Sequence, residues 1–508
     1  MEIHPLLILV IGVAVVIGMM VAARINAFIA LITASMVVSV LSPGDLTGKI
    51  GRVATAFGAT AASVGIVIAL AAVIGKCLMD SGAADRIVLS LLGLIGQKRA
   101  SLALTASGFT LSIPVFFDTA FYLLVPLAKS AFHRQGKNYL LYLMAIVAGA
   151  AATHTLVPPT PGPLFVANQL GVDLGVMILV GAVIGLPAAG AGLLFGWWLD
   201  RRMPVVPGSV RDDAKTADPE PRRLPSLAIS LAPIVLPIAL ITTNSFVKLA
   251  AQRAMERQPE ILSGTPAERF VHETGLGSWE ETAAGRPVLR PLRGDDLDLA
   301  LSAAASEGLP LAELCQWTNL LGDPNLALLL AAGVALFTLW RRIGDGGRVA
   351  KAVEQSLMSG GVIILITAAG GAFGGMLKQA GMGGAIEELF GERAVSGLPL
   401  LFLAFSMASL LKFAQGSSTA AMIVTSGMVA AMIEDPSALA FHPVYLAVAV
   451  GGGSLVGSWM NDSGFWIYGK MGELSEVETL QSWTPLLAVV GAASMAFNTL
   501  LAVFLPLR

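Results

Sequence analysis

Long apolar runs recur along this chain and constrain its fold more than any other feature. Examples are residues 5–22, 26–42, 175–199, 226–243, 324–340 and 484–506. An α-helix rises about 1.5 Å per residue, so about 20 apolar residues cross the roughly 30 Å hydrocarbon core of a bilayer. A buried core helix would explain one such run but not so many. We therefore expect an all-α polytopic membrane protein.

Composition agrees with this expectation and excludes several classes of partner. The 508 residues are 55% hydrophobic and 13% charged, whereas a soluble domain carries about 25% charged residues. The net charge of −2 argues against nucleic acid as a partner. The two cysteines, Cys77 and Cys315, form no metal-binding or redox motif. We expect no metal and no other cofactor.

Basic residues predict the orientation in the membrane. Lys and Arg favour short cytoplasmic loops, and the segments 201–225 and 341–351 are rich in both. Two membrane crossings separate these segments, so the acid-rich polar segment between the crossings, 248–322, is expected outside, in the periplasm. Counting membrane crossings from these loops puts both chain termini outside.

The two halves of the chain resemble each other. Gly75, Leu78 and Gly82 recur as Gly374, Leu377 and Gly381, at a constant offset of 299 residues. The loop at Arg24 is expected inside, whereas its counterpart, 248–322, is expected outside. Matching sequence with opposite sidedness is an inverted repeat, which is typical of secondary transporters. The alternative is chance similarity among helices rich in Gly, Ala and Leu.

An inverted repeat predicts the domain organisation. The expected parts are repeat 1 at 1–200, a cytoplasmic linker at 201–225, the first helix of repeat 2 at 226–247, an external insertion at 248–322, and the remainder of repeat 2 at 323–508.

Each half also carries two polar interruptions, in corresponding places: 113–123 and 153–163 in the first half, 412–422 and 452–462 in the second. Unwound backbone at membrane depth is tolerated only where it is buried in protein or lines an aqueous cavity. The prolines of 158–163 cannot all sit in a continuous helix, and the glycines of 451–453 weaken their own helix. We expect a re-entrant hairpin and an unwound, broken transmembrane helix in each repeat.

The stretch 415–419, QGSST, suits a hairpin tip that starts a new helix, because Gly, Ser and Thr are favoured at helix N-caps. The free N–H groups and the positive dipole end of that helix attract an anion. The three hydroxyls can bind a carboxylate or a substrate hydroxyl. The alternative is a capped loop at the membrane surface, with Lys412 extending to the lipid headgroups.

Several motifs resemble those of the gluconate permease family, within the larger ion transporter superfamily. They are AAVIGKCLMDSG at 71–82, IPVFFDTAF at 113–121, HTLVPPTPGP at 154–163, GGAFGGMLKQAG at 370–381, FAQGSSTAAM at 413–422 and NDSGFW at 461–466. The resemblance implies import of gluconate or related hydroxy acids, usually with protons, across the bacterial inner membrane. Some family members carry D-serine, glycerate or hydroxybutyrate.

The chain departs from the family pattern at three positions, and this leaves the particular anion open. Thr160 stands where the family commonly has a second histidine, and Thr155 stands where it commonly has glycine. The tip reads QGSST where QGSAT is common.

The candidate site residues come from the four interruptions. The expected substrate-binding residues are Gln415, Gly416, Ser417, Ser418, Thr419, Phe117, Thr119, His154, Pro159 and Asn461. A proton-coupled transporter also needs a titratable group inside the membrane. Asp118 is the first choice, His154 the second, and Asp462 the third. The alternative for both carboxylates is a helix cap, and for the histidine it is a packing role.

The leading hypothesis is a secondary active transporter that imports a small hydroxycarboxylate by proton symport. Alternatives are an uncoupled organic-anion channel or facilitator, and a symporter for a different small acid. No HExxH, GxSxG or Walker motif occurs, so neither an enzyme nor a primary pump is expected. The expected partners are the anion, protons and membrane lipid. Assembly into a homo-oligomer stays open.

Overall fold

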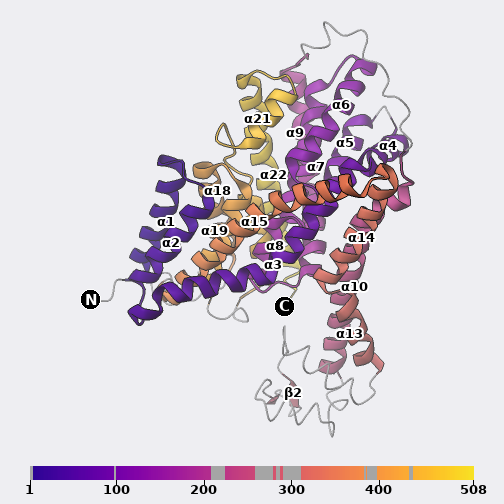
Figure 1. Cartoon of the computed structure of the whole chain (residues 1–508). Helices are drawn as coiled ribbons and strands as arrows, with labels where there is room; N and C mark the ends of the chain where they lie inside the picture. Colours follow the sequence, from indigo (N-terminus) through magenta and orange to yellow (C-terminus); the bar gives the residue numbers. More distant parts are fainter. Residues whose placement is uncertain are drawn as a thin grey trace.

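The computed structural model describes residues 4–96, 99–206, 224–257, 279–281, 287–289, 310–382, 385, 397–433 and 439–507. Most of these residues are helical (Figure 1). The helices of the first half are α1 (Pro5–Ile17), continued by a π-helical turn (Gly18–Ala22), α2 (Ala27–Leu41), a 3₁₀ turn (Leu46–Gly48), α3 (Lys49–Asp80), α4 (Ala83–Ile95), α5 (Ala100–Leu111), α6 (Phe117–Gln135), α7 (Tyr139–Leu156), α8 (Pro161–Gln169) and α9 (Leu174–Arg202).

The second half follows with the same kinds of element. Its helices are α10 (Leu227–Arg257), α13 (Pro310–Leu321), α14 (Pro324–Ile343), α15 (Gly346–Gln379), α18 (Leu398–Gln415), α19 (Ser418–Met432), α20 (Val444–Gly453), α21 (Ser463–Met471) and α22 (Glu476–Phe504). Two short strands, β1 (Trp279–Glu281) and β2 (Pro287–Leu289), pair antiparallel inside the polar segment. The segment therefore adds a small hairpin to an otherwise helical fold.

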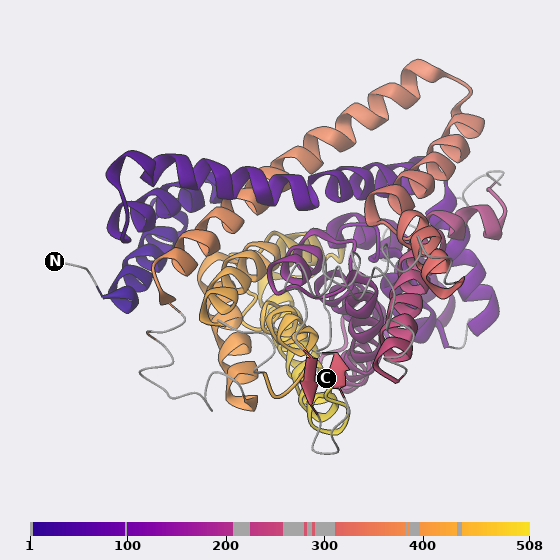
Figure 2. The ribbon, with the colours of Figure 1, turned by 90° about the horizontal axis from the view of Figure 1, so that it is seen from below.

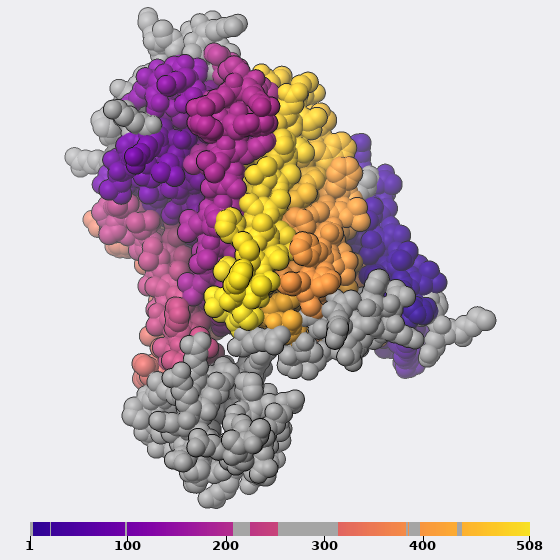
Figure 3. All heavy atoms as spheres, turned by 180° about the vertical axis from the view of Figure 1, so that it is seen from behind, coloured from indigo at the N-terminus to yellow at the C-terminus, as the bar shows by residue number. Residues whose placement is uncertain are grey.

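Eight helical segments among the described residues are long and apolar enough to cross a membrane, which agrees with the expected polytopic helical protein. They are Leu46–Asp80, Tyr139–Gln169, Leu174–Arg202, Leu227–Ala251, Pro324–Ile343, Gly346–Gln379, Leu398–Gln415 and Glu476–Phe504. Large apolar side chains are exposed along several of these segments. Leu410 on α18, Leu194 on α9 and Phe504 on α22 are 66%, 69% and 80% exposed. Such a surface suits lipid rather than water, and Figure 3 shows α22 lying between α9 and α18 on one face.

The ends of the helices show which loops share a face. The Ser245 hydroxyl, in the C-terminal half of α10, donates to the Asp173 carboxylate at the start of α9 (2.5 Å), and Gly322, before α14, packs against Asn244. The insertion therefore leaves the helices at this end. The basic residues that end α9 and α14 lie at the opposite end, where Arg201 stacks on Trp197 with 3.6 Å to the ring centroid. α10 runs to Arg257, beyond the expected boundary at 247.

Four breaks interrupt the apolar helices, close to the expected places. They lie between α5 and α6, α7 and α8, α18 and α19, and α20 and α21. Pro161 begins α8, where a missing N–H costs nothing. The expected break at 452–462 begins two residues later, because the glycines of 451–453 form the last turn of α20 and the chain unwinds directly after them. They allow close packing instead, since a Cβ at Gly451 would lie 2.4 Å from the Thr155 carbonyl oxygen.

The centre of the protein is formed by α7 and α20, which are buried along nearly their whole length. The long helices α3 and α15 pack against each other and cross one side of this centre (Figure 2). α15 continues inward to pack on α8 and α19. This arrangement brings the four breaks toward one region between the two halves.

Candidate functional site

A cavity of about 590 Å³ lies where the four breaks meet. The first residues of four helices line it: Phe117 of α6, Pro161 of α8, Ser418 of α19 and Ser463 of α21. Each helix N-terminus carries a partial positive charge and N–H groups that the helix itself does not satisfy. The cavity therefore offers four anion-attracting helix ends in a confined space.

The structure brings most of the candidate residues to this cavity. The lining includes Gln415, Gly416, Ser417, Ser418, Thr419, Phe117, Thr119, His154, Asn461, Asp118 and Asp462. Pro159 departs from the expectation, because it is buried in the turn between α7 and α8 and does not line the cavity. Pro161, at the first position of α8, lines it instead. The α15 residues Ser359, Ile363 and Ile366 contribute a wall that no sequence motif indicated.

The tip at 416–419 is held against the second break of the same half. Gly416 ends α18 with φ of 78°, and a Cβ there would lie 2.1 Å from the Asn461 carbonyl oxygen. Only glycine fits both the left-handed backbone and this close approach. The Ser417 hydroxyl caps α19 by accepting from the Ala420 N–H (3.2 Å), and the Ser418 hydroxyl donates to the Ser454 carbonyl (2.9 Å). Two of the three tip hydroxyls therefore support structure.

An ion pair joins the same two segments. The Lys412 ammonium donates to the Asp462 carboxylate (2.6 Å) and to the Gly416 carbonyl (2.7 Å). The side chains of Lys412 and Asp462 are 1% and 13% exposed. Lys412 is therefore buried at the cavity wall and does not extend to lipid headgroups, because a carboxylate lies within its reach. A lysine within an apolar run, next to a predicted break, was the sequence signal for this role.

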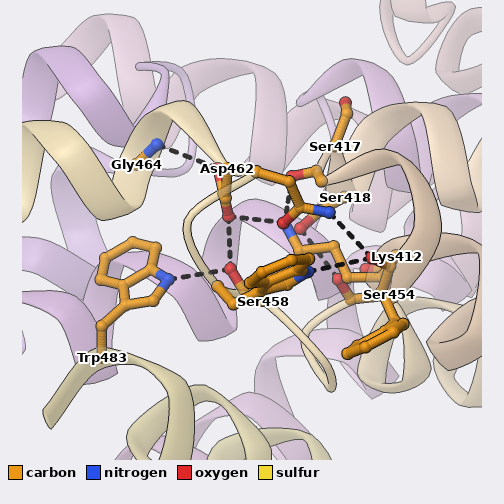
Figure 4. Close-up of polar contacts among 12 residues, drawn as sticks. Lys412, Ser417, Ser418, Ser454, Ser458, Asp462, Gly464 and Trp483 are labelled. Atoms are coloured by element: carbon orange, nitrogen blue, oxygen red, sulfur yellow. Dashed lines mark hydrogen bonds and ion pairs between the residues drawn. The ribbon is translucent and has the colours of Figure 1, made fainter. Parts of the chain in front are cut away.

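Asp462 is held by further donors, as Figure 4 shows. Its carboxylate accepts from the Gly464 N–H (2.9 Å), which caps α21, and from the Ser458 hydroxyl (2.5 Å). The indole of Trp483 donates to that hydroxyl (2.8 Å), and its ring packs edge-on against Phe117, with centroids 5.3 Å apart. This chain of contacts links the second break to the start of α6 in the first half. Ser458 and Trp483 were not among the expected site residues, although Ser458 lies within the interruption at 452–462.

The charges around the cavity do not balance. Asp118, in the first turn of α6, is close enough to Lys412 and Asp462 to interact electrostatically with both. One ammonium therefore faces two carboxylates. An anion that enters increases the excess of negative charge unless a cation accompanies it.

Some polar groups at the cavity are buried without a partner within the described part of the chain. These are Nε2 and Oε1 of Gln415 and Nδ1 of His154. A buried polar group that stays unpaired costs about 1–3 kcal/mol, so these atoms are ready to bond a ligand with hydroxyl groups. Across the described ranges, no three His, Cys, Asp or Glu side chains are grouped to hold a metal ion.

Comparison with known proteins gives consistent results. The family model for GntP family permeases matches residues 4–264 and 301–504, and it leaves unmatched a part of the expected insertion. An uncharacterized permease of Haemophilus influenzae is 32% identical over 93% of this chain and 87% of its own. A gluconate permease of Pseudomonas aeruginosa is 29% identical over 99% of both chains. The crystal structure of the Alcanivorax borkumensis YdaH transporter has a TM-score of 0.55 at 14% identity, covering 95% of this chain and 98% of its own.

Proposed function

Since this chain belongs to the GntP permease family, it is an integral membrane transporter and not an enzyme, and we propose that it imports a sugar acid such as gluconate together with protons. The observation that carries the proposal is the cavity at which four helix N-termini meet. A carboxylate suits such a site, because N–H groups and helix dipoles favour negative charge. The gluconate permease of Pseudomonas aeruginosa supports the class of anion.

In this proposal the tip of α19 binds the carboxylate. Ser417 and Thr419 lie at the first turn of α19 and line the cavity. The hydroxyl-bearing tail of a sugar acid lies toward Gln415, His154 and Asn461. Among the described residues, Nδ1 of His154 and both amide atoms of Gln415 have no partner. They gain hydrogen bonds from such a tail, whereas a purely apolar tail would leave them unpaired.

Asp118 takes the proton. Anion entry adds negative charge beside two carboxylates and one ammonium, and a proton on Asp118 offsets that charge. Asp462 is less suited, because it already has three donors in Ser458, Gly464 and Lys412. His154 is the second choice, since its Nδ1 is buried at the same cavity.

The fold behind this site is proposed to be an inverted repeat with two re-entrant hairpins, α5–α6 and α18–α19. The helix bounds support it: α3 ends at Asp80 and α15 at Gln379, separated by the sequence offset of 299 residues. The helix pairs α2/α14, α5/α18, α6/α19, α7/α20, α8/α21 and α9/α22 follow in the same order. The basic ends of α9 and α14 then face the cytoplasm, with the insertion and both chain termini outside.

A reconstitution experiment tests the function. Proteoliposomes with an alkaline interior and an acidic exterior are expected to accumulate labelled gluconate above its external concentration. A protonophore is expected to abolish the accumulation. Uptake that stops at equal concentrations and ignores the protonophore would indicate an uncoupled facilitator. Accumulation driven by a sodium gradient would identify sodium as the coupling ion in place of the proton. If gluconate did not compete with another small acid for uptake, that acid would replace gluconate as the proposed substrate.

The tip is tested by removing one hydroxyl. Thr419→Val keeps the shape of the side chain, and we expect it to weaken gluconate binding roughly ten- to a hundredfold, because one hydrogen bond to a charged partner is worth about 1.5–3 kcal/mol. Thr419→Ser should restore most of the affinity. Ser417→Ala is a poorer probe, since it also removes the cap of α19.

Calorimetry on the purified protein measures these affinities. Thr55→Val is the matched control, because Thr55 is exposed and its hydroxyl donates to a carbonyl of its own helix, that of Gly51. An unchanged gluconate affinity in Thr419→Val, with Thr55→Val also unchanged, would exclude the tip as the carboxylate site.

A further inference from the structure

A second cavity, of about 340 Å³, lies apart from the site cavity. Its lining comes mainly from the ends of three helices: Asn168 and Gln169 of α8, Gly371, Gly374, Gly375 and Lys378 of α15, and Gly427, Ala430 and Ala431 of α19. The lysine and the two amides make it polar at one edge. No residue of the second cavity belongs to the four breaks.

The two cavities share the same three helices, which pack on one another pairwise. α8 reaches the site cavity at Pro161 and the second cavity at Asn168, and α19 does so at Ala420 and at Gly427. On α15 the corresponding residues are Ile366 and Gly371. Five to seven residues separate the two sets on each helix, which is about 7–10 Å along a helix axis. Three independent helices therefore give the same short separation.

One layer of side chains fills this separation. Met422 and Ile423 of α19 are fully buried. A Cβ at Gly370 would lie 1.8 Å from Cγ2 of Ile423, and a Cβ at Gly162 would lie 2.0 Å from Cε of Met422. The two side chains thus occupy the space that these glycines of α15 and α8 leave open. We call this the Met422–Ile423 layer.

The cavities also lie toward opposite ends of the helices. The second cavity includes Leu170 and Gly171, just before Asp173, which bonds Ser245 at the insertion end. The site cavity includes Trp483 near the start of α22. That start lies at the basic end, because Gly472 packs on Leu143 at the start of α7, where the Asp200 carboxylate accepts from the Leu141 N–H (3.1 Å).

We propose that the second cavity is a vestibule through which the substrate anion enters or leaves on the insertion face. The path to the site runs between α8, α15 and α19, and the Met422–Ile423 layer closes it in this conformation. Lys378, Gln169 and Asn168 are the first groups that a hydroxylated carboxylate meets there. The identity of the anion rests on the proposed function, whereas the path does not. Methionine suits a closing layer, because its unbranched side chain repacks easily.

Cysteine labelling tests the path without any substrate. In a chain carrying Cys77→Ala and Cys315→Ala, the variants Glu313→Cys and Arg348→Cys mark the two faces, since both positions are exposed, one on α13 within the insertion and one near the start of α15. A membrane-impermeant thiol reagent is applied to sealed vesicles of either orientation. Ala430→Cys should react from the face that labels Glu313→Cys, and Ser359→Cys from the face that labels Arg348→Cys.

Two results of this labelling would overturn the proposal. One is reaction of Ala430→Cys from the Arg348→Cys face, and the other is no reaction from either face. The assignment is independent of which face is outside, because the markers are read in the same vesicles. Complete labelling of Ala430→Cys should also block gluconate uptake. Full uptake after complete labelling would show that the anion does not pass there.

Kinetics give the second test. Lys378→Gln should raise the KM for gluconate uptake from the insertion face roughly three- to tenfold at low salt, because a vestibule cation raises the local concentration of an anion. The equilibrium Kd for gluconate and the maximal rate should stay unchanged. Lys351→Gln, near the other end of the same helix, is the matched control and should leave the KM unchanged. An unchanged KM in Lys378→Gln would remove the lysine from the path. If the wild-type chain does not transport gluconate, the proposed function fails, and the labelling still decides the path.

Discussion

The substitution Asp118→Asn is expected to abolish accumulation of gluconate against its gradient. The substitution keeps the shape of the Asp118 side chain and removes its titratable group. Asparagine is neutral, like the protonated form of Asp118, so the anion can still bind, but its uptake no longer carries a proton and is not driven by the proton gradient. Exchange of external for internal gluconate needs no net proton movement, so it should persist. Proteoliposomes measure both activities, with a proton gradient for accumulation and equal pH for exchange.

Asp80→Asn is the matched control for this prediction. Asp80 pairs with Lys76 at 3.0 Å on the surface of α3, with both side chains about one-third exposed. Such a pair contributes about 0.3–0.5 kcal/mol, and its loss should leave accumulation at the wild-type level. Proton-driven accumulation by Asp118→Asn equal to that of Asp80→Asn would exclude Asp118 and make His154 the next candidate.

Lys412→Met is expected to have the largest effect on stability. It leaves the Asp462 carboxylate at the cavity wall without its ammonium partner, and breaking a buried ion pair in this way costs about 3–5 kcal/mol. That cost corresponds to a change of more than about a hundredfold in the folding equilibrium. It should appear as a large fall in the Tm of the detergent-solubilised protein. The tip at Gly416 should also loosen, since its carbonyl accepts from the same ammonium.

The double variant Lys412→Met/Asp462→Asn should recover most of the lost stability. Neutralising both partners removes the unpaired charge, and asparagine still caps α21. Lys76→Met supplies the control, because it breaks an exposed pair of the same type. Equal falls in Tm for Lys412→Met and Lys76→Met would contradict the claim that the buried Lys412–Asp462 pair stabilises the fold more than the exposed Lys76–Asp80 pair. A double variant no more stable than Lys412→Met would mean that the lysine acts through its stem and not through its charge.

Sequence reasoning predicted the features that depend on neighbours along the chain. The apolar runs predicted where helices long enough for a membrane would form, because helix length and hydropathy are local quantities. The prolines of 158–163 predicted the break before α8, since a proline blocks the helix through its own missing N–H. The stretch 415–419 predicted an N-cap at the start of α19, because capping likewise depends on residues that are close together along the chain.

The tertiary structure decided everything that depends on contact across the chain. Glycines at 451–453 are compatible with a break or with close packing, and only the carbonyl of Thr155 beside Gly451 selected packing. Lys412 is compatible with a headgroup contact or a buried pair, and the position of Asp462 selected the pair. Pro159 and Pro161 belong to one motif, yet the path of the turn puts only Pro161 at the cavity. The layer between the two cavities likewise depends on α8, α15 and α19 meeting. Residues far apart in sequence meet only through the packing of whole helices, so a linear pattern names the side chains but does not determine which of them come into contact.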